Sequence, residues 1–96
     1  MSTVGVKKLD NSTFEVVVQA GTPTTHIVTV APDYAAKLTG DRTSTEQLVA
    51  RSFDFLLERE PNTSILRRFD LPVIGRYFPE YERVIRRMLE QMGAGQ

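Results

Sequence analysis

The sequence predicts an α+β domain in which an antiparallel β-meander of two or three strands is followed by two main helices and short helical turns packed on one face of the sheet. Two observations carry this prediction. β-Branched residues in alternating order are concentrated before Pro32, and apolar residues at helical spacing follow it. We expect one domain over residues 1–96, with its β part at about 3–31, its helical part at about 33–92 and a frayed tail at 93–96.

The strands are predicted from alternation and from turn residues. In residues 13–19 (TFEVVVQ) apolar side chains occupy every second position, and residues 25–30 (THIVTV) are rich in β-branched side chains. The intervening AGTPT carries a glycine and a proline, so the two runs should form an antiparallel hairpin with a long loop. Residues 3–9 (TVGVKKL) precede a DNS turn signal and add a third strand, which Gly5 weakens.

The first two helices are predicted from their end signals. A short helix at about residues 33–38 begins after a proline and ends at Gly40. A longer helix begins at Ser44, which forms a capping-box pattern with Gln47, and it ends before Pro61. Its apolar residues recur at three- and four-residue intervals and form one broad stripe.

The remainder of the chain contains short turns and one clear helix. We expect a brief helix at residues 65–69 and another helical turn that Asp70 can cap. In residues 81–92 (YERVIRRMLEQM) the apolar positions fall at i, i+3, i+4, i+7, i+8 and i+11, which predicts an amphipathic helix that Gly93 ends.

Apolar side chains that share a face in these elements should form one core. Burial of a large apolar side chain stabilises the fold by about 1.5–3 kcal/mol, so this set should dominate the energetics. The predicted core is Phe14, Val16, Val18, Val28, Val30, Leu48, Val49, Phe53, Leu56, Ile65, Leu66, Phe69, Ile74, Val84, Ile85, Met88 and Leu89.

Composition and charge argue against several classes of function. The 96 residues include 12 basic and 12 acidic side chains, and residues 1–43 balance at four of each sign. No arm or tail of one charge is present to attract nucleic acid or an acidic membrane. The absence of cysteine excludes disulfides, catalytic thiolates and zinc–thiolate sites. Because the sequence has no apolar signal segment and no apolar run of membrane-spanning length, we expect a cytoplasmic protein.

Residues 64–79 (SILRRFDLPVIGRYFP) permit two interpretations. Arginines among aromatic rings can bind phosphates and stack on bases, as in a small nucleic-acid-binding regulator. Acidic residues among these arginines would neutralise much of their field, and the seven apolar side chains of the stretch favour core packing. The nucleic-acid patch would consist of Arg67, Arg68, Arg76, Arg83, Arg86 and Arg87.

A domain of this size can leave part of an aromatic cluster uncovered. Phe55 lies off the apolar stripe of its helix, and Tyr77, Phe78 and Tyr81 gather around Pro79. Aromatic residues flanked by arginine are typical of protein–protein interfaces. The candidate interaction surface is therefore Phe55, Arg76, Tyr77, Phe78 and Tyr81.

No catalytic set stands out in the sequence. His26 is the only histidine, and nothing in the spacing of Ser12, Thr24 or Thr25 selects one of them as its nucleophilic partner. We interpret His26 as a loop-end residue without function. No metal-ligand spacing and no phosphate-binding loop is present, so we expect no metal and no cofactor. The last helix has balanced charge on its polar face, which favours a core or dimer face over a membrane anchor.

Two segments resemble a known family. THIVTVAPDYAAKLTG and LVARSFDFLLEREPNTSILRRFDLPVIGRYFPEYE are similar to a family of short bacterial proteins of uncharacterised function. The resemblance spans roughly residues 14–82, and LLEREP…SIL…F…PVI…YFPEYE is its most distinctive part. It implies an intact small domain, and it supplies no activity, cofactor or catalytic residue.

The leading hypothesis is a non-enzymatic protein-interaction or accessory module, monomeric or homodimeric, whose partner is an unknown protein or a second copy. It would act through the aromatic–arginine surface or through an open strand edge. The alternative is the nucleic-acid-binding regulator described above. A third class, an enzyme that acts through His26, predicts that His26→Ala abolishes activity but suggests no assay.

Overall fold

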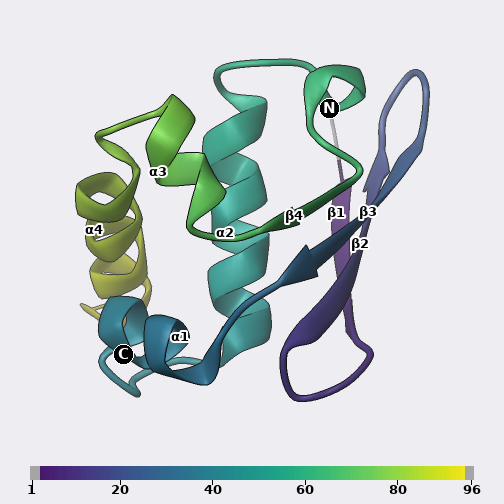
Figure 1. Cartoon of the computed structure of the whole chain (residues 1–96). Coiled ribbons are helices and arrows are strands. Elements are labelled where there is room, and N and C mark those ends of the chain that lie inside the picture. Colours follow the sequence, from purple (N-terminus) through teal and green to yellow (C-terminus); the bar gives the residue numbers. More distant parts are fainter. Residues whose placement is uncertain (1–2, 95–96) are drawn as a thin grey trace.

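The computed structural model describes residues 3–94, with the side chains of residues 3–91, and in this range it contains one four-stranded sheet (Figure 1). The first three strands are antiparallel, whereas the fourth is parallel to the third. The protein is therefore α+β, but its sheet is mixed and has four strands where the predicted meander had two or three. The strand order is β1 (Thr3–Lys8), β2 (Thr13–Gln19), β3 (Thr24–Thr29) and β4 (Arg68–Asp70).

Four helices and one 3₁₀ turn make up the helical part of residues 3–94. Ser44 caps the long helix as predicted, because its Oγ accepts a hydrogen bond of 3.1 Å from the Gln47 backbone N–H. Gly40 ends the short helix in the left-handed region at φ 61°. The last helix continues past Gly93, where we expected it to end, and residues 95–96 of the expected tail lie outside the described residues. The elements are α1 (Pro32–Thr39), α2 (Thr45–Leu57), η1 (Asn62–Ser64), α3 (Val73–Tyr77) and α4 (Tyr81–Ala94).

The prediction of a helix at residues 65–69 is wrong, because the chain there is extended and enters the sheet. The Ile27 backbone N–H donates to the Arg67 carbonyl at 2.7 Å, and the Leu71 N–H donates to the Thr29 carbonyl at 2.9 Å. These bonds fix β4 beside β3 in parallel register. A parallel pair needs a long crossover, which α1, α2 and η1 provide here.

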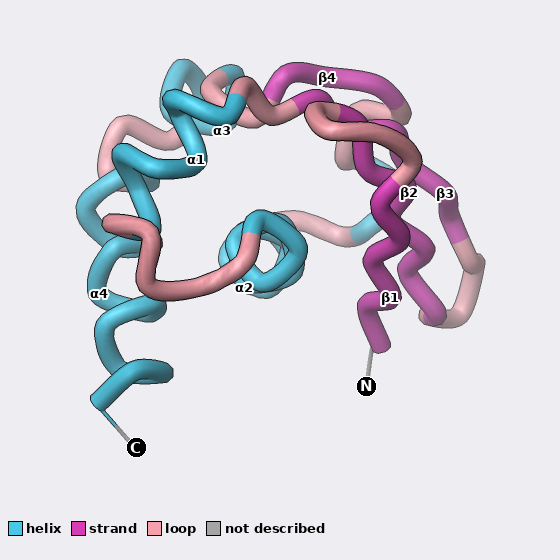
Figure 2. The backbone as a smooth tube through the Cα atoms, turned by 90° about the horizontal axis from the view of Figure 1, so that it is seen from below, coloured by secondary structure: helices cyan, strands magenta, loops and turns pink. Residues whose placement is uncertain are grey.

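The α2 helix lies between the sheet on one side and α4 on the other (Figure 2). Toward the sheet, the ring of Phe53 lies 5.3 Å from that of His26. Toward α4, the ring of Phe55 lies 5.3 Å from that of Tyr81, and the Ser52 hydroxyl lies 2.6 Å from the Tyr81 hydroxyl. A helix covered on two sides buries more than one stripe, which is why Phe55 is fully buried although it lies off the predicted stripe.

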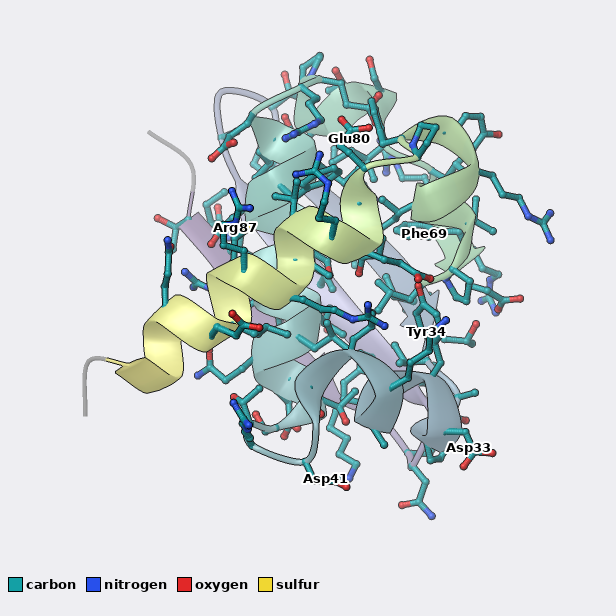
Figure 3. All side chains as sticks on the ribbon, turned by 90° about the vertical axis from the view of Figure 1, so that its left-hand side faces the viewer. Asp33, Tyr34, Asp41, Phe69, Glu80 and Arg87 are labelled. Carbon is teal, nitrogen blue, oxygen red and sulfur yellow. The ribbon has the colours of Figure 1, made fainter. Side chains whose placement is uncertain are left out.

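A polar contact joins α1 to α4. The Tyr34 hydroxyl donates to Glu82 at 2.9 Å, and the Lys37 ammonium lies 3.4 Å from the same carboxylate. Figure 3 shows Tyr34 on α1, on the side that faces α4. The hydrogen bond from Tyr34, followed by the charge of Lys37, lowers the pKa of Glu82 although partial burial opposes this.

Most of the predicted core is confirmed. The exceptions are Val84 and Met88, which are half-buried against the core, and Leu66, which is 48% exposed and was wrongly assigned to it. Ile65 and Leu66 are neighbours where the chain leaves η1 in an extended conformation, so only one of them can face inward. The buried apolar residues that the prediction missed are Ala35, Leu38, Phe55, Leu71 and Tyr81.

None of the helices within residues 3–94 combines the length and the apolar character that crossing a lipid bilayer requires.

Candidate interaction site

A pocket of about 390 Å³ opens at the end of the molecule where α2 ends and α3 begins. Its walls are mostly apolar and come from the chain between residues 56 and 78. Leu56 lies at the end of α2, Phe69 comes from the inner face of β4, and Ile74 and Phe78 come from α3 and the residue after it. The volume falls in the range that binding pockets commonly have. Eight of its ten lining residues belong to the stretch of residues 64–79 that permitted two interpretations.

The local chain geometry explains why this pocket exists. The short strand β4 turns Phe69 inward between two exposed neighbours, as the two-residue period of a strand requires. Pro72 then starts α3, whose five residues bury Ile74, and the Phe78 N–H closes the turn by donating to the Ile74 carbonyl at 2.8 Å. Because α3 ends after little more than one turn, it does not cover the space between itself and the loop before β4.

Two exposed apolar side chains border this pocket, and we call it the Leu66–Tyr77 pocket. Leu66 is 48% exposed and Tyr77 is 67% exposed. In the part of the chain whose side chains are described, the only other large apolar residue with comparable exposure is Leu9, at 47%. A single exposed apolar side chain is ordinary, but two beside one apolar pocket form the kind of patch that marks an interaction site.

Glu60 is the only charged residue that lines the pocket, and Ser64 is the other polar one. Glu60 is half-buried, and in the described part of the chain no hydrogen bond or ion pair reaches its carboxylate. A carboxylate in this position makes the pocket selective. Any ligand that covers Glu60 removes the water bound to its carboxylate and must donate hydrogen bonds to it instead.

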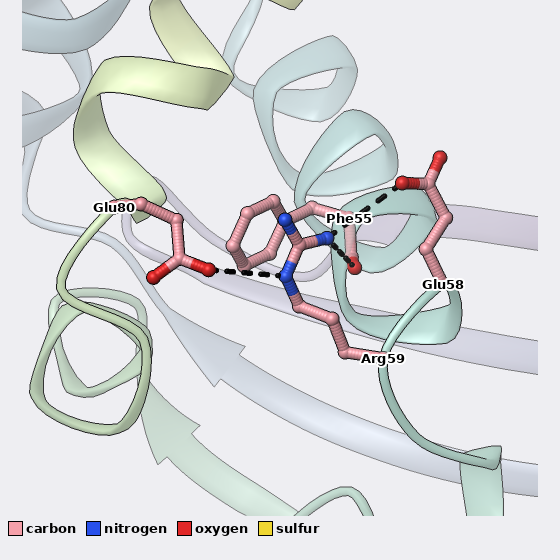
Figure 4. A network of polar contacts seen from close by, with 4 residues as sticks. All are labelled: Phe55, Glu58, Arg59 and Glu80. Carbon is pink, nitrogen blue, oxygen red and sulfur yellow. Dashed lines mark hydrogen bonds and ion pairs between the residues drawn. The ribbon is translucent and has the colours of Figure 1, made fainter.

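Arg59, the basic residue next to Glu60 in the sequence, is bound to Phe55 and Glu80 (Figure 4). Its guanidinium carbon lies 3.6 Å from the ring centroid of Phe55, and its Nη1 donates to the Phe55 carbonyl at 3.0 Å. Its Nε lies 3.4 Å from Glu80, and Glu58 is a further, more exposed contact at 3.6 Å. These contacts hold Arg59 over the junction of α2 and α4, so that it does not neutralise Glu60.

The structure corrects the predicted interaction surface. Phe55 and Tyr81 are fully buried between α2 and α4, so neither can touch a partner. Phe78 is half-buried and lines the pocket, whereas Arg76 and Tyr77 are exposed on α3. Sequence reasoning placed Leu66 in the core and therefore missed it as a site residue. The sequence analysis did not recognise that the chain before β4 is extended, which turns Ile65 and Leu66 to opposite sides.

Behind the pocket wall lies a buried polar network around His26. The His26 Nδ1 lies 2.8 Å from the Leu66 carbonyl, and its Nε2 lies 2.8 Å from the Thr24 hydroxyl. The Asn62 amide donates to the Thr24 hydroxyl, also at 2.8 Å, and to the Thr22 carbonyl. A carbonyl can only accept, so Nδ1 carries the proton and the Thr24 hydroxyl donates to Nε2. The network therefore ties the backbone of Leu66 to the sheet.

The interpretation of His26 as a loop-end residue is wrong, because it lies within β3 and is fully buried. Burial is the main cause that lowers the pKa of His26. The hydrogen bond to Leu66 opposes this shift, and the positive charge of Arg67 adds to it. Thr24, the neighbour that the fold selects, is also buried. The pair has the geometry of a nucleophile and a base, but a substrate could reach it only if the fold opened.

The six arginines of the alternative nucleic-acid patch are all exposed, and they come from three elements. Arg83, Arg86 and Arg87 lie on α4, Arg76 lies on α3 beside it, and Arg67 and Arg68 lie at β4, which pairs with β3 in the sheet (Figures 1 and 2). Figure 3 shows Arg87 along α4 and Glu80 just before the helix begins. Within the described residues, no group of three or more His, Cys, Asp or Glu side chains is placed to hold a metal ion.

Comparisons of this chain with protein-family models, with curated proteins and with solved structures found no match. The resemblance to a family of short bacterial proteins therefore stays a prediction.

Proposed function

We propose that this protein is a non-enzymatic interaction module that binds a protein partner through the Leu66–Tyr77 pocket. The observation that supports the proposal is the position of Leu66 and Tyr77, two largely exposed apolar side chains, at the edge of one apolar pocket. A partner that covers both and fills the pocket removes this apolar surface from water, at about 25 cal/mol for each Å² buried.

Anchoring of the pocket walls further supports this function. Interfaces obtain most of their affinity from a few rigid residues that bind without reorganisation. The His26 network fixes the backbone of Leu66, and the i→i−4 hydrogen bond of Phe78 fixes the end of α3. Both walls are therefore preorganised, and little entropy is lost when a partner binds.

The test is an affinity capture from the native cells with matched variants as bait. Leu66→Ser and Tyr77→Ser remove the apolar borders of the pocket, and Leu9→Ser changes the third exposed apolar residue at a distant turn. A partner of the pocket should be retained by the wild type and by Leu9→Ser but lost by the two pocket variants. All three positions are exposed, so the thermal midpoints should stay within a few degrees of the wild type. A capture pattern that is identical for all four proteins, together with self-association that Leu66→Ser leaves unchanged, contradicts the proposal.

Nucleic-acid binding is the second candidate, and the exposure of its six arginines is the observation in its favour. Such binding should weaken steeply as the salt concentration rises, because each arginine–phosphate contact releases a counterion. A mobility-shift assay at low salt with duplex and single-stranded probes decides between the two. A salt-sensitive shift that the Arg67→Gln, Arg68→Gln double variant removes would replace the pocket with the arginines as the functional surface.

A further inference from the structure

We propose that the occupant of the Leu66–Tyr77 pocket is the β1–β2 turn of a second copy of this chain, which inserts Leu9 and places a lysine beside Glu60. This inference rests on the proposed function and names the partner of that site. Each contact joins two unlike surfaces, since one copy contributes the turn and the other contributes the pocket.

The chemistry of the pocket defines what its occupant must carry. Its apolar walls require an apolar side chain, and the carboxylate of Glu60 requires a nearby cation. An apolar occupant alone would strip water from Glu60 without replacing its hydrogen bonds, and an acidic occupant would be repelled.

The β1–β2 turn carries both features. Leu9 is 47% exposed, and the two residues before it, Lys7 and Lys8, are exposed lysines. In the part of the chain whose side chains are described, Leu9 is the one exposed large apolar residue that does not already border the pocket. The contact would therefore cover all three exposed large apolar side chains at once.

The turn is also held in a defined shape. The Leu9 N–H donates to the Thr13 carbonyl at 2.8 Å, and the Asp10 carboxylate accepts a 2.9 Å bond from the Ser12 N–H. The only acidic side chain of the turn is thus engaged within it. A rigid protruding side chain loses little freedom when it enters a pocket, which favours binding by the turn over binding by a flexible tail.

The geometry excludes insertion within one molecule. Figure 1 shows the β1–β2 turn at the lower right, whereas α3 and the C-terminal end of α2 lie at the top. The turn of one copy can therefore reach only the pocket of another copy. Contacts of this kind either repeat head to tail into chains or closed rings, or are made twice in an antiparallel dimer.

The test uses complementary variants in sedimentation velocity from the micromolar to the millimolar range. The wild type should show a mass that increases with concentration. Leu9→Ser, which lacks the insert, and Leu66→Ser, which lacks the pocket border, should each lose about tenfold or more in self-association. An equimolar mixture of the two should form a dimer and nothing larger, because it contains one intact insert and one intact pocket.

Charge variants test the role of Glu60. Glu60→Gln should weaken self-association about threefold to tenfold, as expected for a partly desolvated ion pair. Glu58→Gln is the matched control, because Glu58 lies two residues away and does not line the pocket, and it should leave the association unchanged. Equal effects of the two substitutions would contradict the role of Glu60.

Three results would overturn the inference. The wild type could remain a monomer to millimolar concentration, the mixture of variants could fail to pair, or Leu9→Ser could associate as strongly as the wild type. If one of these occurs while Leu66→Ser and Tyr77→Ser still lose a captured protein, the pocket binds a different partner and the proposed function stands. If no partner depends on the pocket, both fail together.

Discussion

A fall in pH from 7 to 5 should destabilise this protein chiefly through His26. The neutral ring is held by a directional chain of bonds, from Asn62 to Thr24, from Thr24 to His26 Nε2, and from His26 Nδ1 to the Leu66 carbonyl. Protonation places a second N–H opposite the Thr24 hydroxyl, whose own proton then loses its acceptor. It also places a charge in the core beside Phe53 and near Arg67.

The sign and size of the effect follow from linkage between proton binding and folding. Burial lowers the pKa of His26 in the folded protein below its ordinary value of about 6.5. Between the two pKa values the unfolded chain binds more protons, so the free energy of unfolding decreases as the pH falls below about 6.5. The slope is at most about 1.4 kcal/mol per pH unit, and the loss by pH 5 is at most about 2 kcal/mol. Above about pH 7 the His26 ring is neutral in both the folded and the unfolded chain, so no stability is lost there.

Urea denaturation followed by circular dichroism from pH 8 to pH 5 measures the slope. The chain has one histidine, so no other side chain of ordinary pKa titrates between pH 5 and pH 7. His26→Gln keeps a donor and an acceptor but cannot titrate, and its stability should be flat over this interval. Titration of the His26 ring protons by NMR gives the folded pKa directly in the wild type. A pKa at or above 6.5, or the same slope in both proteins, would refute the reasoning.

Three further predictions concern the stability of the fold, and urea denaturation measures each. Phe55→Ala should lower the free energy of unfolding by about 3–5 kcal/mol, because the side chain is fully buried; a loss below 1 kcal/mol would place it at the surface, as the sequence suggested. Ser52→Ala should cost about 1–3 kcal/mol because it leaves the buried Tyr81 hydroxyl without a partner, whereas Tyr81→Phe should cost only about 1 kcal/mol; the reverse order would contradict the bond between them. Gly40→Ala should cost about 1 kcal/mol because Gly40 adopts φ 61°, and no change would mean that the end of α1 relaxes.

Local signals predicted the elements that depend on nearby residues. The hairpin of β2 and β3 follows from alternation within a few residues and a loop between them. The cap of α2 is a contact between Ser44 and Gln47, three positions apart. Such features are formed by groups that remain close in any compact state of the chain, so the sequence is sufficient to identify them.

The site could not be predicted in the same way. β4 is three residues long, too short to show alternation, and it becomes a strand only because β3 offers it a free edge some 40 residues earlier in the sequence. Its pairing decided that Leu66 faces solvent beside the pocket. It also brought the Leu66 carbonyl to His26, a residue that looked like the end of a loop.

The sequence by itself determined the α+β class, the helix that Ser44 begins and the apolar faces of β2 and α4. The tertiary structure alone decided that α2 is covered on two sides, which buries Phe55 and Tyr81, and that α3 leaves a pocket open between Leu66 and Tyr77. The physical reason is that a periodic pattern reports how many faces of an element are apolar. Which neighbour covers each face, and which apolar side chain is left over, depends on contacts between residues that are distant in the chain.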